Sequence, residues 1–261
     1  MIDTIIEKLK EIEERENVRI LYCVESGSRA WGFASPDSDY DVRFIYVRPK
    51  EFYLKLEKTR DVIEWQLDET LDINGWDIQK ALRLLHSSNP TLFEWNSSPI
   101  IYITTEEWQT VSKVINGFFT KKAGLYHYLS AAKKNYREYL HGETVRLKKY
   151  FYVVRPLLAC MWILKHGTPP PMLFDVLAAE CLDSELKPAV DKLLQMKRET
   201  PELGEGPRIG VINDYIDRSL EEIGAVIAEL PEEGSGSWEM LNSLFLAIVN
   251  VEVLRSCSAE I

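Results

Sequence analysis

Two aspartates separated by one residue are the first feature of this sequence that could do chemistry. Asp39 and Asp41 follow a segment rich in turn formers and lead into an apolar run that ends at Val47. On a β-strand, side chains two positions apart point to the same face, so these two carboxylates are expected to lie side by side. Two like charges this close favour a cation between them, and Mg²⁺ or Mn²⁺ is the cation that prefers carboxylates, waters and substrate phosphates. The pair therefore predicts a divalent-metal site at a strand end.

A turn upstream of the aspartates has the composition of a phosphate-binding segment. Residues 18–25 are a β-branched and aromatic run, typical of a buried strand, and Gly27 and Ser28 interrupt it. Glycine lets a backbone approach a phosphate closely, and free N–H groups at a helix start attract anions. We expect Ser28 to donate its hydroxyl and N–H to a phosphate, whereas Arg29 suits a phosphate contact and a surface salt bridge equally well. A phosphate-binding turn next to a metal site is the equipment for phosphoryl or nucleotidyl transfer.

The order Gly27-Ser28, a spacer, then Asp39-x-Asp41 resembles the signature of the DNA polymerase β-type nucleotidyltransferase superfamily. The longer string GSRAWGFASPDSDYDVRFIY is similar to one branch, the predicted nucleotidyltransferases associated with RNA repair and RNA ligases. The resemblance implies an α+β fold, in which a small mixed-sheet domain like the palm of polymerase β precedes an all-helical domain. It also implies an NTP substrate and a Mg²⁺ or Mn²⁺ cofactor. More loosely, it implies an RNA end as the acceptor and an RNA ligase as a partner.

A third carboxylate is expected on a neighbouring strand, where it would join a metal ion and orient or deprotonate the attacking hydroxyl. Glu64, Asp68, Asp72 and Asp77 are the candidates. In the related families an Asp shortly before a helix start like that at residues 76–80 has this role, and Asp72 matches it. Asp77 fits better as the N-cap of the helix that follows. The sequence favours Asp72 and leaves Glu64 and Asp77 open.

Cations and aromatic residues are concentrated at residues 146–156, which read RLKKYFYVVRP. On a helix Lys148 and Tyr152 would share a face, as would Lys149 and Tyr152, and Arg155 would follow one turn later. This mixture suits a triphosphate and a stacked base, although an amphipathic helix with lysines extended along an apolar surface has the same pattern. We expect these four side chains to contact the nucleotide.

Other basic residues have less definite signals. Lys133 and Lys134, on the preceding predicted helix, could extend a basic face or could belong to a solvated surface. Lys197 and Glu199 lie just before a Gly- and Glu-rich loop and resemble a recurring segment of the same family, with no role indicated.

The composition is that of an ordinary globular protein with an acidic surface. The 261 residues are 46% hydrophobic and 28% charged, and their net charge of −10 argues against a general nucleic-acid coat. No apolar run reaches the length of a membrane span, and the N-terminus reads as an amphipathic charged helix, not a signal peptide. The four cysteines form no CxxC pair. We therefore expect a cytoplasmic protein with no membrane partner.

The chain changes character near residue 105. The first part reads as helices at 3–16, 78–85 and 91–96 and strands at 18–25, 42–47, 62–67, 69–75 and 99–103. After it strand signals stop, and the periodicity predicts helices at 105–117, 120–141, 143–166, 171–180, 183–198, 208–229 and 237–256. We expect a nucleotidyltransferase catalytic domain at 1–104 and a helical substrate-binding domain at 105–261.

We expect an enzyme, a nucleotidyltransferase that moves an NMP from an NTP to an acceptor hydroxyl and releases pyrophosphate. In this hypothesis Asp39 and Asp41 bind two metal ions, and Asp72 joins one of them and is suited to act as the base. Transfer to a protein side chain or a small molecule is an alternative that the acidic net charge mildly favours. A non-catalytic nucleotide-binding regulator is the other alternative, and the intact Asp39-x-Asp41 pair argues against it.

Overall fold

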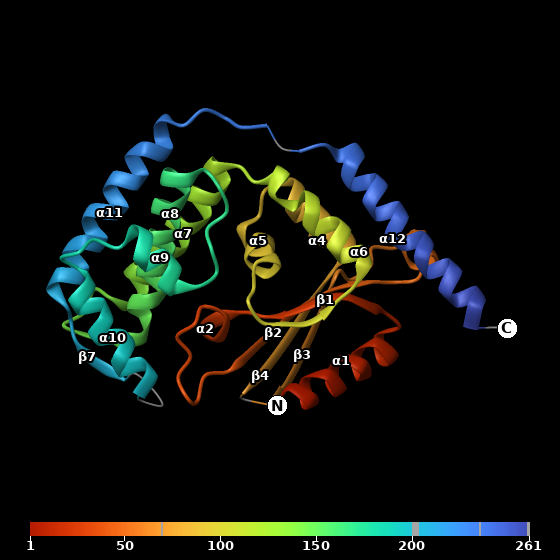
Figure 1. Ribbon diagram of the computed structural model, residues 1–261, viewed down its shortest axis with the longest axis horizontal. Helices are drawn as coiled ribbons and strands as arrows, with labels where there is room; N and C mark the ends of the chain where they lie inside the picture. The colour runs from red at the N-terminus through yellow and green to blue at the C-terminus, as the bar shows by residue number, and fades with distance from the viewer. Residues whose placement is uncertain (69, 200–203, 235, 260–261) are drawn as a thin grey trace.

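The computed structural model describes residues 1–68, 70–199, 204–234 and 236–259, and it confirms the expected α+β fold (Figure 1). A five-stranded sheet has its strands in the order β3-β4-β2-β1-β5. The strands are β1 Arg19–Glu25, β2 Tyr40–Val47, β3 Val62–Asp68, β4 Leu71–Asp77 and β5 Ile101–Thr104. The sheet is mixed, because β2 and β4 pair in parallel whereas the other neighbours pair antiparallel.

The parallel pairing of β2 and β4 follows from the connection between them. β3 and β4 pair antiparallel, and residues 48–61, which include the short helix α3 (Lys50–Tyr53), lead from β2 to β3 at the outer edge of the sheet. β4 therefore returns between β3 and β2 and runs in the same direction as β2. The register places the Cα atoms of Asp41 and Asp72 opposite each other.

Different helices cover the two faces of the sheet. The apolar stripe of α1 (Ile2–Glu16) packs on one face, together with Val42 of β2. Ile45 points to the opposite face, and since side chains alternate along a strand, Asp41 and Arg43 share that face. Four helices cover this second face: α4 (Ile78–His86), α5 (Pro90–Asn96), α6 (Glu106–Val114) and α12 (Trp238–Ala259).

Helices α4 and α5 begin at residues that the sequence marks as helix starts. The carboxylate of Asp77 accepts a hydrogen bond from the Gln79 N–H at 2.8 Å, which confirms its predicted role as an N-cap. The side chain of Asn89 accepts from the Thr91 N–H at 3.0 Å, and Pro90 occupies the first turn of α5. These caps fix where the chain turns from the sheet into the covering helices.

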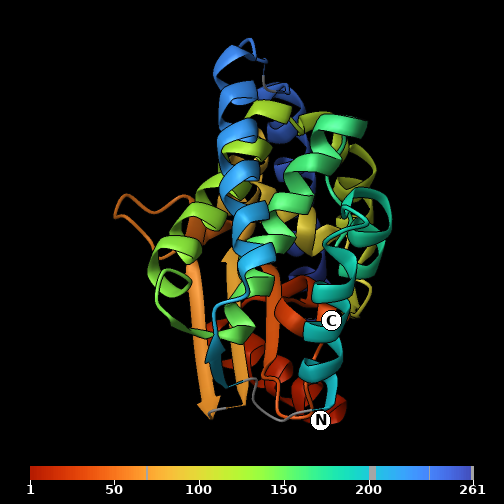
Figure 2. The same ribbon diagram turned by 90° about the vertical axis from the view of Figure 1, so that its left-hand side faces the viewer.

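The remaining long helices form a second group with a core of its own, seen from its outer side in Figure 2. They are α7 (Lys121–Tyr139), α8 (Phe151–His166), α9 (Phe174–Cys181), α10 (Lys187–Glu199) and α11 (Gly210–Glu229). Phe33 follows the short helix α2 (Gly27–Ala30) and is buried in this second core, against Phe151 and Phe174. Within the described part of the chain, no helix has both the length and the apolar composition needed to cross a membrane.

Two short strands interrupt the helical part, where we expected helices alone. β6 (Thr144–Arg146) pairs antiparallel with β7 (Glu205–Pro207). The helix predicted at 143–166 accordingly begins later, because residues 147–150 form the 3₁₀-helix η2 and α8 starts at Phe151. Another 3₁₀-helix, η1 (Ile115–Phe118), follows α6. Strands this short leave no periodicity in the sequence, and their pairing joins segments that are far apart in the chain.

The buried cores bring together residues from both sides of position 105. Trp108 of α6 packs into the core on the second face of the sheet, and so do Leu241 and Ile248 of α12. In Figure 1 the chain leaves α11, passes over the top of the molecule and returns as α12 beside α4. The domain limit near residue 105 therefore stays a prediction.

A buried ion pair joins the two groups of helices. Arg155 of α8 is 2% exposed, and its Nη1 lies 2.8 Å from Oε1 of Glu94 in α5. The hydroxyl of Tyr128 in α7 donates to the same oxygen at 2.9 Å, and Nη2 of Arg155 donates to the Met172 carbonyl at 3.2 Å. The guanidinium carbon lies 4.6 Å from the centre of the Trp31 ring. Arg155 thus ties α5 and the segment after β1 to α7 and α8.

We expect Arg155→Ala to lower the free energy of unfolding by about 3 kcal/mol, because removing one partner leaves the other charge buried and unpaired. The matched control is Arg60→Ala, since Arg60 pairs with Glu64 and both side chains are about two-thirds exposed, at 66% and 68%. Its loss should cost at most about 0.5 kcal/mol. Urea unfolding followed by circular dichroism measures both, and equal costs would contradict the assigned role of Arg155.

Candidate active site

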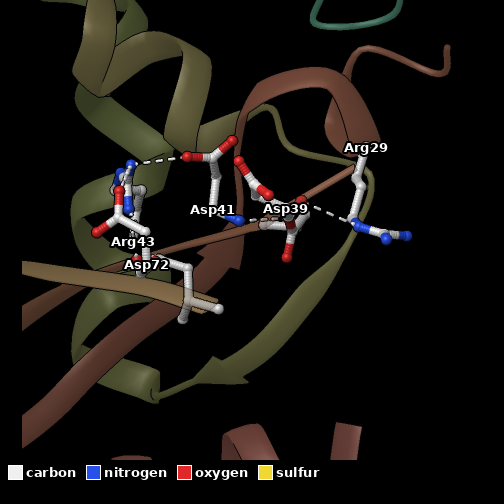
Figure 3. A network of polar contacts seen from close by, with 7 residues as sticks. Arg29, Asp39, Asp41, Arg43 and Asp72 are labelled. Atoms are coloured by element: carbon white, nitrogen blue, oxygen red, sulfur yellow. Dashed lines mark hydrogen bonds and ion pairs between the residues drawn. The ribbon is translucent and has the colours of Figure 1, made fainter. Parts of the chain in front are cut away.

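The three aspartates singled out in the sequence lie on one face at one end of the sheet (Figure 3). Asp39 directly precedes β2 and is exposed. Asp41 is the second residue of β2, and Asp72 is its partner on the neighbouring strand β4. The Asp41 side chain is 31% exposed and that of Asp72 is 52% exposed. The parallel register therefore brings together the carboxylates that the sequence predicted to act jointly.

Arg43, which the sequence gave no role, lies between two of these carboxylates (Figure 3). Its Nη2 is 2.9 Å from Oδ1 of Asp41 and 2.7 Å from Oδ2 of Asp72. Its Nη1 donates to the carbonyl of Asp72 at 3.0 Å and to that of Val42 at 3.1 Å. Side chains two residues apart on a strand share a face, so the spacing of Asp41 and Arg43 in the sequence could have predicted this contact.

The charges around Asp41 act in opposite directions on its protonation. Burial is the largest cause that raises the pKa of Asp41 above its ordinary value, and the neighbouring charges of Asp72 and Asp39 raise it further. The guanidinium of Arg43 opposes them. A cation near Asp41 is therefore favourable, because it stabilises the charged form of this carboxylate.

A buried glutamate, also missed in the sequence, holds the backbone of Asp41. Glu25, at the end of β1, is fully buried, and its Oε1 accepts the Asp41 N–H at 2.8 Å. Its Oε2 accepts from the Tyr102 hydroxyl at 2.5 Å, and its carbonyl accepts from the Ser98 hydroxyl at 2.6 Å. Burial raises the pKa of Glu25, and the hydrogen bonds from Tyr102 and Asp41 oppose that shift. The sequence feature that could have identified Glu25 is an acidic residue at the end of an otherwise apolar strand.

Gly27, the first residue of α2, places the backbone at the start of this helix against the carboxylate of Asp41. Its φ is +58°, a left-handed conformation, and a Cβ at this position would lie 2.0 Å from Oδ2 of Asp41. The N–H groups of Gly27, Ser28 and Arg29 make no hydrogen bond to any other described residue. The turn is thus both close to the acid and open to an anion, as the sequence predicted for a phosphate-binding segment.

Arg29 stabilises the loop that carries Asp39. Its Nη2 donates to the Ser38 carbonyl at 2.6 Å and its Nε to the Asp39 carbonyl at 3.1 Å (Figure 3). The guanidinium carbon lies 3.7 Å from the centre of the Tyr40 ring. These contacts are with backbone and an aromatic ring and do not form the surface salt bridge considered from the sequence, whereas the phosphate contact stays a prediction.

Tyr152, one of the helical residues predicted to bind nucleotide, lies near the acids, and Lys149 lies beside Tyr152. Tyr152 packs edge-on against Trp31 with ring centres 5.5 Å apart, and burial followed by the charges of Asp41 and Asp39 raises the pKa of Tyr152. Nζ of Lys149 lies 4.9 Å from the centre of the Tyr152 ring. Tyr152 therefore lies within range of the charges of Asp41 and Asp39, and it contacts Trp31 and Lys149.

The other helical candidates differ in their access to the site. Lys148 is half-buried in η2, beside Lys149. The guanidinium of Arg155 is directed instead into the ion pair with Glu94, so the structure gives no support to its predicted contact with the nucleotide.

Lys197, whose role the sequence left open, reaches the same region from α10. It is 7% exposed, its Nζ lies 5.9 Å from the Phe33 ring centre, and it makes no hydrogen bond or ion pair with the described residues. Burial lowers its pKa, Asp37 opposes that shift, and Lys148 adds to it. The described residues offer this ammonium no carboxylate partner, so it is open to an anion from outside the chain. Glu199 is exposed and accepts a hydrogen bond from the Gln195 side chain at 3.0 Å.

The alternatives for the third carboxylate lie elsewhere. Glu64 is an exposed residue of β3, and the side chain of Asp68 lies outside the described residues. Asp77 is engaged as a helix cap at the other end of β4 from Asp72. Asp72 alone among the described candidates has Asp41 as its direct neighbour, which favours it for this role.

The donor set suits a hard divalent cation. Among the described residues, no three His, Cys, Asp or Glu side chains are placed to hold a metal ion as they stand. Asp39, Asp41 and Asp72 nevertheless offer carboxylate oxygens on one face, and the guanidinium of Arg43 already occupies the place of a shared cation. These three residues would hold Mg²⁺ or Mn²⁺ once Arg43 turns aside.

We expect Gly27→Ala to be more destabilising than Gly32→Ala. Both glycines have left-handed φ, +58° and +87°, so both alanines carry a backbone cost of about 1–2 kcal/mol. At Gly27 the new Cβ also displaces Asp41 from Arg43, whereas at Gly32 it lies 3.2 Å from a flexible Leu173 methyl group. Urea unfolding should show an additional loss of about 1 kcal/mol for Gly27→Ala. Equal losses would mean that Asp41 is not held by this turn.

Sequence relatives of this chain are known. Residues 1–247 match the family described as the RNA repair pathway DNA polymerase beta family. The uncharacterized protein YcgL of Bacillus subtilis (strain 168) is 49% identical over 253 residues, which cover 95% of this chain and 96% of that protein. A nucleotidyltransferase-like protein from Exiguobacterium sibiricum 255-15 aligns over 84% of this chain and 73% of its own, at 15% identity and a TM-score of 0.29, which is too low to support an argument. The match over nearly the whole length shows that this chain belongs to the RNA repair pathway DNA polymerase beta family.

Proposed function

We propose that this protein is a divalent-metal-dependent nucleotidyltransferase that transfers an NMP from an NTP to an acceptor hydroxyl. The observation that carries the proposal is the meeting of Asp39, Asp41 and Asp72 beside the open turn at Gly27 and Ser28. Carboxylates are ligands for Mg²⁺, and free backbone N–H groups are donors for phosphate oxygens. Membership of a polymerase β family supports the same class of reaction.

In the proposed reaction the acceptor oxygen forms a bond to the α-phosphorus of the NTP. The bond from that phosphorus to the oxygen bridging the β-phosphate breaks, and pyrophosphate leaves. Gly27 and Ser28 donate N–H groups to the phosphate oxygens, and Asp72, the more exposed of the paired acids, takes the acceptor proton. Mg²⁺ held by the aspartates supplies charge stabilisation for the attacking and leaving oxygens.

The second helical group supplies the cations and the aromatic surface for the nucleotide. Tyr152 lies near enough to the aspartates to feel their charges, and it offers a ring on which a base can stack. Lys149 lies beside that ring, Lys148 precedes Lys149 in the chain, and the charge of Lys148 acts on Lys197; we assign these three lysines to the triphosphate. Arg155 has a supporting role, because its terminal nitrogens are already bonded within the fold.

An RNA end is the acceptor that we propose. Lys149 also lies 4.0 Å from the centre of the Tyr139 ring, and the Arg146 guanidinium lies 6.0 Å from the same ring. Cations alternating with rings thus lead from Tyr152 towards the surface, an arrangement that suits single-stranded nucleic acid. The family description supports a role in RNA repair, and we propose an RNA ligase as a partner on the same basis. The net charge of −10 favours the alternative acceptor, a protein side chain or a small molecule.

We expect the wild-type protein, supplied with Mg²⁺ or Mn²⁺, to transfer label from an α-labelled NTP to a pool of RNA 3′ ends. Asp41→Asn should lower this rate at least about a hundredfold, because the charge developing in the transition state loses its stabilisation. Arg60→Gln, which removes an exposed charge far from the aspartates, serves as the control and should leave the rate unchanged.

The destination of the label decides between the acceptors. Label on RNA that disappears with Asp41→Asn supports the proposed reaction. Label on protein, or on a small molecule from a cell extract, would replace RNA as the acceptor. If wild type and Asp41→Asn bound NTP equally, with no dependence on a divalent ion, the catalytic proposal itself would be wrong.

We expect Lys197→Met to weaken NTP binding while leaving the fold as stable as before or more so. A charge-assisted hydrogen bond to phosphate contributes about 1.5–3 kcal/mol, so the dissociation constant should rise about tenfold or more. Methionine keeps the apolar length of the side chain and removes a partly desolvated charge that has no carboxylate partner in the described chain, which favours the folded state. The control is Lys192→Met, an exposed lysine on the same helix. Isothermal titration with a non-hydrolysable NTP, together with urea unfolding, separates the two effects, and unchanged affinity would exclude Lys197 from the phosphate site.

A further inference from the structure

The guanidinium of Arg43 lies where a cation shared by Asp41 and Asp72 would lie (Figure 3). Its Nη2 is within 2.9 Å of Asp41 Oδ1 and 2.7 Å of Asp72 Oδ2, and its Nη1 is fixed by two backbone carbonyls. The Arg43 side chain is 18% exposed, so the pair of contacts is partly shielded from water. These four bonds hold one planar group against both carboxylates.

The backbone gives the two carboxylates little freedom to separate. Asp41 and Asp72 are direct partners in the parallel β2–β4 register, so their Cα atoms cannot move apart without breaking the sheet. Without a cation the two charges would repel each other. A divalent ion that binds both would need the oxygens that Arg43 now holds, and two cations cannot occupy the same place between them.

Asp39 differs from the other two aspartates. Within the described chain no side chain donates a hydrogen bond to its carboxylate, and only its backbone carbonyl is engaged, by Arg29. Oδ2 of Asp41 also accepts no hydrogen bond from the described residues, and it packs against Gly27, where an added Cβ would lie 2.0 Å from it. An ion can therefore bind Asp39 and the free oxygen of Asp41 first, whereas the addition of Asp72 requires Arg43 to leave.

We propose that Arg43 is a tethered counter-cation that competes with the divalent ion and controls whether Asp72 joins the metal site. The inference rests on the proposed function, since it takes a divalent ion as the ligand of the aspartates. Arg43 is a positioning residue in this view. It holds Asp41 and Asp72 together before the ion binds, and it releases them when the ion takes its place.

The consequence is a measurable limit on metal affinity. Each charge-assisted bond that Arg43 makes to a carboxylate must be broken before the ion gains that oxygen, so Arg43 weakens binding. The opposite holds for a purely structural arginine, whose removal would disorder the carboxylates and weaken metal binding. The sign of the change in affinity therefore separates the two roles.

The test is Mn²⁺ binding to the full chain without nucleotide, measured as free Mn²⁺ by electron paramagnetic resonance. We expect Arg43→Gln to bind Mn²⁺ about tenfold more tightly than wild type, corresponding to about 1.4 kcal/mol. Arg43→Lys should also bind more tightly, because an ammonium keeps the charge but lacks the second terminal nitrogen that anchors Arg43 to the carbonyls of Val42 and Asp72. In an Asp72→Asn background the same Arg43→Gln change should alter the affinity less than about twofold, since the competition is for Asp72.

Several outcomes would overturn the inference. Equal or weaker binding by Arg43→Gln would make Arg43 structural, and an unchanged affinity in Arg43→Lys would reduce the effect to net charge. A full tenfold gain in the Asp72→Asn background would place the competition elsewhere. If wild type binds Mn²⁺ and the variants do not differ, only this inference fails. If neither wild type nor Arg43→Gln binds Mn²⁺, the proposed function fails with it.

A second measurement on the wild-type protein covers the case in which a variant does not fold. The side-chain ¹⁵N signals of Arg43, assigned through Arg43→Lys, should shift and sharpen on addition of Mg²⁺, because a released guanidinium rotates freely. The side-chain signals of Arg48, held by the Glu16 carbonyl and carboxylate away from the aspartates, should not change. If the Arg43 signals do not change at saturating Mg²⁺, Arg43 is not released from Asp41 and Asp72, and the inference is wrong.

Discussion

The parallel pairing of β2 and β4 is the constraint on which the rest of the site depends. It places Asp41 directly beside Asp72. The backbone hydrogen bonds between the two strands keep these residues adjacent, even though their carboxylates repel each other. The energy of bringing two like charges together is offset by the guanidinium of Arg43. Glu25 fixes the Asp41 backbone from the neighbouring strand, and the Gly27 turn closes the remaining side. Each of these neighbours contacts Asp41, whose position is set by the pairing of the strands.

The second helical group is attached to this site through apolar and ionic contacts of the segment between β1 and β2. Phe33 is buried in the core of that group, and Trp31 lies between Tyr152 and Arg155. The segment that carries the proposed phosphate-binding turn is therefore held at one end by the sheet and along its length by helices. A nucleotide bound there would touch both groups, so its binding depends on their relative position. The Arg155–Glu94 ion pair fixes that position from within.

The sequence was sufficient wherever the signal was local. Gly27, Asp39 and Asp41 lie within one short segment, and the strand, turn and strand expected there are present. Asp72 could be named, but its place beside Asp41 depends on a strand order that no local pattern contains. Glu25 and Arg155 were missed or given another role for the same physical reason: their partners, Tyr102 and Glu94, are 77 and 61 residues away. A buried basic residue such as Arg155 pairs within the fold instead of binding a ligand. Whether a residue is buried depends on the assembled fold and not on the local sequence.

The path of α12 has a consequence for how the chain is made. Its residues Leu241, Ile248 and Val249 belong to the core that covers β1, α4 and α5, the elements synthesised first. That core cannot be complete before residue 249 has left the ribosome, so the early part of the chain carries an uncovered apolar face throughout synthesis. The helices at 121–229 meet no such delay, because nearly all of their core lies within that range. The half of the protein that is translated first is therefore the half whose burial is finished last.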